Sequence, residues 1–149
     1  MEYKSLIDEM KEKIPSVNSV DMRTLSPLVL AYIGDSVMDL FVRTYFATSV
    51  NETVSKLNAR AIKVVKASAQ ANILHMLDDV LDDEEKDIVR RGRNAKSATM
   101  PKNADVTDYR LATGLEALLG YLFLNGNTKR ISELFSYVLE KYEKEENKP

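Results

Sequence analysis

The apolar residues of this chain recur at helical spacing and nowhere alternate with polar residues over the length of a strand. Its 149 residues contain only four prolines and five glycines, so long segments run without a breaker. A repeat of three to four residues places apolar side chains on one face of a helix, whereas a strand needs a repeat of two. The sequence therefore predicts an all-α fold.

Residues that begin and end helices divide the chain into segments of helical length. We predict helices over about residues 3–13, 27–48, 53–66, 68–79, 83–91, 105–124 and 128–144. Ser26–Pro27 marks the start of the second helix, which could break at Gly34. The third and fourth helices could be continuous. Gly92 and Gly126 are expected to end the fifth and sixth helices, and residues 145–149 to fray.

Composition excludes several kinds of protein. The chain has no cysteine, which excludes a disulfide framework, a thiolate metal site and a cysteine nucleophile. Its charge-free runs are too short to span a bilayer, and the first ten residues carry acids where a secretory signal carries bases. We therefore expect a soluble cytoplasmic protein without a membrane partner. Residues 1–149 are expected to form one domain, with residues 1–20 as an N-terminal extension helix.

The charges are sorted along the chain, although the formal net charge is only −2. Residues 78–87 hold seven acids and one base, whereas residues 90–102 hold five bases and no acid. Such blocks can be solvated helix faces. Glycine, asparagine, serine and proline in the basic block favour a loop instead, whose backbone could also donate to phosphate. A second basic run, over residues 56–66, holds four bases and no acid.

Two carboxylates stand alone in apolar segments. Asp35 is the sole charged residue in 24–38, and Glu116 is the sole charged residue in 111–128. A buried, unpaired carboxylate costs several kcal/mol, so each needs a partner. One interpretation makes Asp35 a helix N-cap and pairs Glu116 with an arginine. The other brings both acids to a hard divalent cation such as Mg²⁺, which takes one or two protein carboxylates and keeps several waters.

Residues near the two acids add weaker indications. Gly34, Gly114 and Gly120 remove side-chain bulk beside them, which predicts space for a ligand. Asp39, one turn after Asp35, could support a cation from farther out or could be a solvated helix position. His75 is the only histidine, which favours a core or surface role over that of a ligand or base.

Two motifs carry a family resemblance. AYIGDSVMDLFVR at 31–43 and RRGRNAKSATMPKNADVTDYRLATGLEALLGYLFL at 90–124 resemble Mini-ribonuclease III, the short bacterial relative of ribonuclease III that lacks the double-stranded-RNA-binding domain. The resemblance covers roughly residues 25–140. It implies an all-α endonuclease domain that forms a twofold homodimer. It also implies Mg²⁺-dependent hydrolysis of double-stranded RNA, with Mn²⁺ as a substitute, in maturation of the 23S ribosomal RNA precursor.

The resemblance assigns roles to particular residues. Asp35 matches the essential aspartate of the family's GD motif and Glu116 the essential glutamate of its EALLG motif, which makes them the catalytic residues and metal ligands. Full-length ribonuclease III has two further acids, at the positions of Ala31 and Thr113. Attack by water implies 5′-phosphate and 3′-hydroxyl ends. The residues expected to bind the phosphates and 2′-hydroxyls of the RNA duplex are Arg90, Arg91, Arg93, Asn94, Lys96 and Lys102.

Assembly and rival functions remain open at this stage. Residues 28–46 hold more apolar side chains than one helix of a small bundle can bury, which predicts a twofold interface around Val29 and Tyr32. The sequence is also compatible with a non-catalytic RNA-binding or ribosome-assembly protein on the same fold, in contact with ribosomal protein. An all-α nucleotide hydrolase is disfavoured, because Glu84–Glu85 lacks the E-x-x-E spacing.

Overall fold

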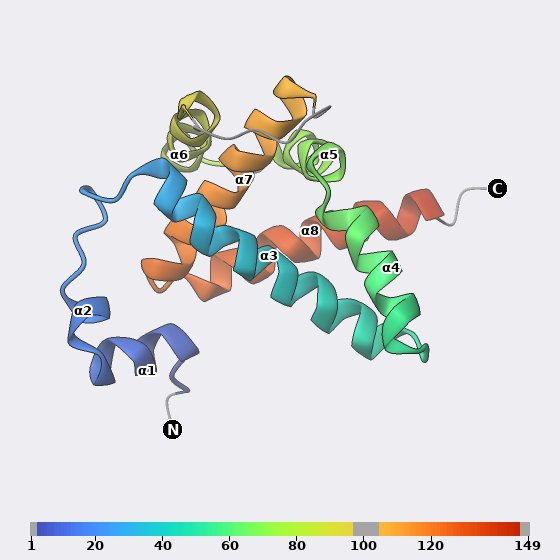
Figure 1. Cartoon of the computed structure of the whole chain (residues 1–149), viewed down its shortest axis with the longest axis horizontal. Coiled ribbons are helices and arrows are strands. Elements are labelled where there is room, and N and C mark those ends of the chain that lie inside the picture. The colour runs from blue at the N-terminus through green and yellow to red at the C-terminus, as the bar shows by residue number, and fades with distance from the viewer. Residues whose placement is uncertain (1–2, 97–104, 147–149) are drawn as a thin grey trace.

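The computed structural model describes residues 3–96 and 105–146, and these are helical without any strand. The all-α prediction is confirmed. No helix in this part of the chain is long and apolar enough to cross a membrane. The helices, shown in Figure 1, are α1 (Leu6–Lys13), α2 (Pro15–Asn18), α3 (Pro27–Ser49), α4 (Val54–Val65), α5 (Ala67–Leu77), α6 (Asp83–Asn94), α7 (Val106–Leu124) and α8 (Thr128–Glu146).

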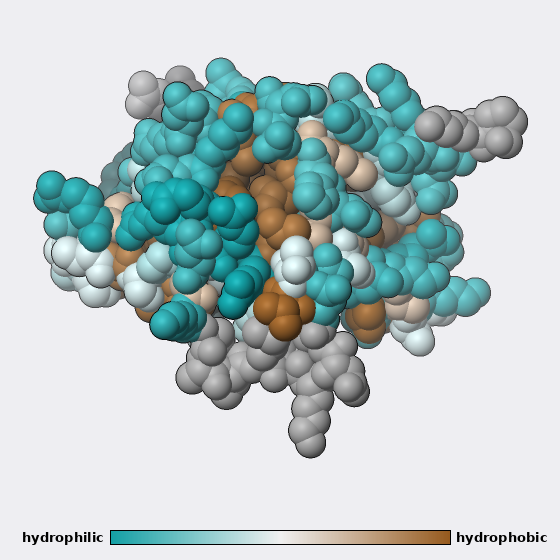
Figure 2. Space-filling model, turned by 90° about the horizontal axis from the view of Figure 1, so that it is seen from above, coloured by the Kyte–Doolittle hydropathy of each residue, from teal (hydrophilic) through white to brown (hydrophobic). Residues whose placement is uncertain are grey.

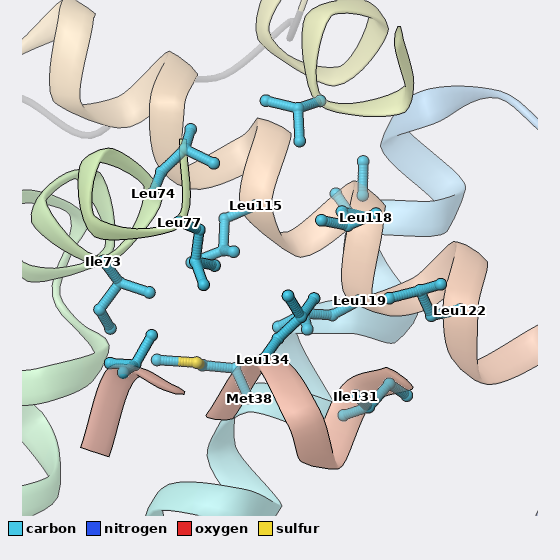
Figure 3. Close-up of a cluster of buried hydrophobic side chains, with 14 of the residues drawn as sticks. Met38, Ile73, Leu74, Leu77, Leu115, Leu118, Leu119, Leu122, Ile131 and Leu134 are labelled. Atoms are coloured by element: carbon cyan, nitrogen blue, oxygen red, sulfur yellow. The ribbon is translucent and has the colours of Figure 1, made fainter. Parts of the chain in front are cut away.

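Helix α7 is the centre of the fold. Helix α3 crosses it, and α6 and α5 lie on either side of its N-terminal half (Figure 1). Its leucines meet residues from α3, α5 and α8 in one apolar core, drawn in Figure 3. Each large side chain fully withdrawn from water stabilises the fold by roughly 1.5–3 kcal/mol. Core residues from these four helices include Met38, Ile73, Leu74, Leu77, Leu115, Leu118, Leu119, Leu122, Ile131 and Leu134.

Glycines allow α3 and α7 to cross at backbone contact. A Cβ atom on Gly34 would lie 1.6 Å from the Glu116 carbonyl oxygen, and one on Gly120 would lie 1.9 Å from the Leu30 carbonyl oxygen. Neither position can carry a side chain without separating the helices. A Cβ atom on Gly114 would lie 2.8 Å from the Val89 carbonyl oxygen. The prediction that Gly34, Gly114 and Gly120 leave space for a ligand is therefore wrong, because helix backbone fills that space. Helix α3 also runs unbroken through Gly34.

Gly92 serves a second helix crossing and does not end α6. The helix continues to Asn94, and a Cβ atom on Gly92 would lie 2.8 Å from the Ala117 Cβ and 3.0 Å from the Gly114 Cα. The prediction of a helix end at Gly92 is wrong, because close packing against α7 explains this glycine. Gly126, by contrast, has φ +79° and follows the end of α7. The prediction that Gly126 ends this helix is therefore confirmed.

A buried ion pair joins α6 to α8. Arg130 Nε and one of its terminal nitrogens each donate to a Glu85 carboxylate oxygen at 2.8 Å, and the same terminal nitrogen donates to the Val80 carbonyl at 2.7 Å. Burial acts to raise the pKa of Glu85, but hydrogen bonds from Arg130 and from the Asp82 backbone outweigh it and leave the pKa below its ordinary value. Glu85 thus stays charged inside the protein.

Candidate active site

The crossing of α3 and α7 brings the two lone carboxylates together. Asp35 follows Gly34, which contacts the backbone of Glu116, and its carboxylate is near enough to raise the pKa of Glu116. Asp35 lies in the interior of α3, whose N-cap is Ser26, so the N-cap interpretation of Asp35 is wrong. Across residues 3–96 and 105–146, neither carboxylate forms an ion pair with a lysine or arginine.

Burial and proximity make Glu116 a weak acid. Desolvation, a hydrogen-bonding interaction with Asp35 and the negative charge of Asp35 raise the pKa of Glu116 to about 8, against an opposing contribution from the Gln70 amide. Asp35 itself is exposed to water. At neutral pH the pair therefore carries about one negative charge fewer than two free carboxylates would. A cation bound between them would replace that proton.

The donor set beside the crossing fits a hard cation that needs few protein ligands. Asp35 and Glu116 supply carboxylate oxygens, and Gln70 Oε1 is a buried oxygen without a hydrogen-bond partner. No described residues form a cluster of three or more carboxylate, histidine or cysteine ligands. Mg²⁺ is typically held by one or two carboxylates and several waters, whereas Zn²⁺ sites use imidazole or thiolate ligands.

The two positions where full-length ribonuclease III carries further acids are buried here. Ala31 and Thr113 are each 8% exposed, and Thr113 Oγ1 donates to the Tyr109 carbonyl at 2.9 Å. Because the Thr113 hydroxyl already donates a hydrogen bond within α7, it does not need a ligand as a hydrogen-bond partner. The direct carboxylates of the site in the described residues are therefore Asp35 and Glu116.

The basic residues near the site lie mostly at the end of a helix. Arg90, Arg91, Arg93 and Asn94 belong to the last turns of α6, and Lys96 follows it. Arg90 and Arg91 lie in the helix predicted over residues 83–91, whereas the loop prediction is wrong for Arg93 and Asn94, because α6 continues past Gly92. The helix buries Glu85, Ile88, Val89 and Gly92, which turns Arg90 and Arg93 toward solvent. Arg90 pairs with Asp87, and Lys102 lies outside the described residues.

A shallow hollow of about 300 Å³ lies where α6 ends and α7 begins. Its lining residues are Leu28, Gly92, Ala95, Lys96, Tyr109, Arg110 and Thr113. Thr113 stands one helical turn before Glu116 on α7, and Leu28 stands two turns before Asp35 on α3, so the hollow with its exposed Lys96 and Arg110 borders the two helices that carry the acidic pair. Sequence reasoning missed Arg110, although its i, i+3 spacing to Thr113 could have placed it on this face.

Two other residues that the sequence analysis considered for the site, Asp39 and His75, are not part of the acidic pair. Asp39 Oδ2 accepts a hydrogen bond from Arg43 Nε at 3.0 Å in an exposed i, i+4 pair, which agrees with the solvated alternative. His75 is exposed on α5, which agrees with a surface role. The buried Gln70 was not singled out from the sequence, because a lone glutamine in an apolar helix carries no motif.

The fold and site define the class of the protein. The chain matches the Ribonuclease III domain family over residues 28–127. Its fold is similar to the crystal structure of protein FN1578 from Fusobacterium nucleatum, with a TM-score of 0.74 and 31% sequence identity over 83% of this chain and 99% of that one. This is an all-α domain of the ribonuclease III class, as the sequence predicted.

Curated relatives narrow the assignment within that class. The chain is 52% identical to Mini-ribonuclease 3 of Thermoanaerobacter sp. strain X514, over 74% of this chain and 78% of that protein. It is 44% identical to Mini-ribonuclease 3 of Clostridium tetani, over 83% of this chain and 82% of that protein. The chain belongs to the ribonuclease III family, in its Mini-ribonuclease III branch.

Proposed function

We propose that this chain is a divalent-metal-dependent endoribonuclease that cuts double-stranded RNA. Family membership supports a ribonuclease activity. The observation that carries the metal-dependent mechanism is the contact between Asp35 and Glu116 at the α3–α7 crossing, which raises the pKa of Glu116 to about 8. A carboxyl group that is buried beside a second carboxylate is unfavourable unless a ligand compensates for it, which favours a functional role.

Asp35 and Glu116 would hold the cation. Mg²⁺ fits this oxygen donor set, and Mn²⁺ can substitute for it. When bound, the cation supplies Lewis-acid chemistry that neutralises charge at the phosphodiester and lowers the pKa of water. The chain contributes position, since the contacts at Gly34 and Gly120 fix the separation of the two helices. Attack by water predicts 5′-phosphate and 3′-hydroxyl products.

The basic end of α6 provides the substrate surface in this proposal. Arg93 and Lys96 are exposed, and Lys96 shares the hollow near Glu116 with Arg110. A-form RNA hides its base edges in a narrow major groove, so contacts to phosphates and 2′-hydroxyls dominate its recognition. Cations beside the acidic pair would hold the backbone of the duplex against the site without reading its sequence.

A homodimer would place one site on each strand of the duplex. Helix α3 exposes Val29, Tyr32 and Leu40, whose residues are 44%, 81% and 63% exposed. The spacing of these residues puts them on one stripe of α3, and the exposed Asp35 lies one turn after Tyr32, beside this stripe. A twofold axis at this stripe would bury the apolar groups and bring two sites into one assembly.

The cellular role in this proposal is maturation of the 23S ribosomal RNA precursor in the cytoplasm, next to assembling ribosomal proteins.

The rival function is an RNA-binding or ribosome-assembly protein without catalysis. The two functions differ in whether the protein cuts RNA and whether cutting needs a metal ion. Binding alone leaves the substrate intact.

The decisive experiment incubates the protein with a long RNA duplex, with Mg²⁺ or with EDTA. We expect cleavage only with Mg²⁺, and products whose 5′ ends carry phosphate. Asp35→Asn and Glu116→Gln should each lower the cleavage rate by orders of magnitude with duplex affinity nearly unchanged. Asp39→Asn, a matched change on the same helix, should cut like wild type. Either ligand variant retaining more than about a tenth of the rate would refute the assigned roles.

A further inference from the structure

Gln70 is the buried polar residue whose hydrogen bonding is incomplete. Its side chain is 3% exposed, and the other buried polar or charged residues described are Glu85 and Thr113. Glu85 is bound by Arg130, and Thr113 donates within its own helix. In the described part of the chain, Gln70 Oε1 is the buried side-chain oxygen or nitrogen that lacks a partner. Such an atom in a folded protein calls for a specific explanation.

The Gln70 amide is held in one orientation by the join between two helices. Helix α4 ends at Val65, Lys66 is extended with φ −65° and ψ 155°, and α5 begins at Ala67. Gln70 Nε2 donates to the Val65 carbonyl at 2.8 Å. A carbonyl only accepts hydrogen bonds, so the nitrogen end of the amide must face Val65. That bond fixes which atom of the amide is the unpartnered one.

Gln70 also reaches the acidic pair. Helix α5 packs along α7, and the Gln70 amide lies close enough to the Glu116 carboxyl group to lower its pKa. The amide nitrogen carries two hydrogens, so a second hydrogen remains to face Glu116 beside the bond to the Val65 carbonyl. The site thus draws on three helices, with Asp35 from α3, Glu116 from α7 and Gln70 from α5.

We propose that Gln70 is a positioning residue of the cation site, which holds the Glu116 carboxyl group with its anchored amide and offers Oε1 as a neutral oxygen to the cation or its hydration shell. This inference rests on the proposed function, because it requires a cation at Asp35 and Glu116. An amide oxygen suits a hard cation. It also adds a donor without adding a third negative charge to two carboxylates that already repel.

Cation binding measured without RNA tests this role separately from catalysis. The full chain would be titrated with Mg²⁺ by calorimetry and with Mn²⁺ by electron paramagnetic resonance. The variants are Gln70→Leu, Gln70→Met and Asp35→Asn, with Asn72→Leu as a control that removes an exposed amide from the same helix. Thermal melting in EDTA would report folding for each variant.

We expect Gln70→Leu and Gln70→Met to weaken Mg²⁺ and Mn²⁺ binding by about 10- to 100-fold, the range for residues that orient metal ligands. Their melting temperatures in EDTA should stay close to that of wild type, because removal of the unpartnered oxygen offsets loss of the bond to the Val65 carbonyl. Asn72→Leu should bind both ions like wild type. Gln70→Met keeps a flexible side chain of similar length, so it tests the role if Gln70→Leu packs poorly.

The outcomes separate this inference from the proposed function. If Asp35→Asn abolished cation binding while both Gln70 variants bound like wild type, the role of Gln70 would be refuted and the proposed function would stand. Variants that melted early yet kept wild-type affinity would show a purely structural glutamine. If the wild-type chain bound neither ion, the proposed function would fail, and the role of Gln70 would fail with it.

Discussion

Replacing Glu116 by glutamine should stabilise the metal-free protein at alkaline pH. Glutamine has nearly the shape of glutamate, but it cannot ionise. The pKa of Glu116 is about 8 in the folded chain, mainly because of burial and then because of Asp35, against an ordinary value of 4.5. Between these two values the unfolded chain has lost the proton that the folded chain retains. The folded state therefore binds more protons in this window, and its stability falls as the pH rises.

The size of the effect follows from the pKa difference. One pKa unit corresponds to about 1.4 kcal/mol, so full ionisation of Glu116 above pH 8 could cost up to roughly 5 kcal/mol. Asp35 is exposed, and water beside it screens the repulsion. We therefore expect Glu116→Gln to gain about 2 kcal/mol over wild type near pH 9, and little near pH 5. In a chain of this size that gain is about 4–8 °C in melting temperature.

The assay is denaturant unfolding in EDTA from pH 5 to pH 9 for wild type and Glu116→Gln. The difference between the two free energies of unfolding should grow with pH, mostly between pH 5 and pH 8, and level off above pH 8. Glu140→Gln removes a carboxylate from an exposed position of α8 and should give no such growth. Added Mg²⁺ should stabilise wild type and not Glu116→Gln. A wild-type-to-variant difference that is flat across the pH range would refute the reasoning.

Other changes test the packing, the substrate surface and the assembly. Arg130→Leu should cost about 3 kcal/mol of unfolding free energy, measured in denaturant, because Glu85 stays buried without its cation; a loss below about 1 kcal/mol would contradict the pair's importance. Gly34→Ala should destabilise by about 3 kcal/mol or more, because its Cβ would lie 1.6 Å from the Glu116 carbonyl oxygen; an unchanged melting temperature would contradict the close crossing. Arg93→Ala and Lys96→Ala should each flatten the salt dependence of duplex affinity by about one unit of slope, with single-turnover cleavage at saturating protein less affected. If the slopes did not change, the RNA-binding surface would have to be sought on the basic run at residues 56–66. Tyr32→Asp should shift sedimentation at micromolar concentration from dimer to monomer, since it puts charge into the proposed apolar interface; a wild-type monomer would remove that interface.

Local sequence determined the helices and most of their ends. Apolar spacing predicted the helical segments except the four-residue α2 (Pro15–Asn18), and Ser26, Thr53 and Asp105 accept hydrogen bonds from the turns that they begin. Gly126 ends α7 because only a residue that tolerates positive φ suits that position. These signals act over a few residues, so they can be read without knowing what each helix packs against.

The isolation of Asp35 and Glu116 in apolar sequence also predicted that the two acids need a partner. The family motifs paired them with each other. Neither observation indicated what surrounds the pair. Gln70 could not be identified from the sequence, because its significance depends on the helix that packs beside α5.

Tertiary structure alone decided what the glycines do. From the local sequence, Gly34 predicted a helix break, Gly92 a helix end, and Gly34 and Gly120 space for a ligand. In the structure each of these glycines lies inside a continuous helix. Their missing side chains let a second helix approach to backbone contact. A glycine in a helix lowers helix propensity by about 1 kcal/mol, and burial against another helix outweighs that loss. Contacts between residues far apart in the chain therefore decide both the path of α6 and the meeting of the two acids.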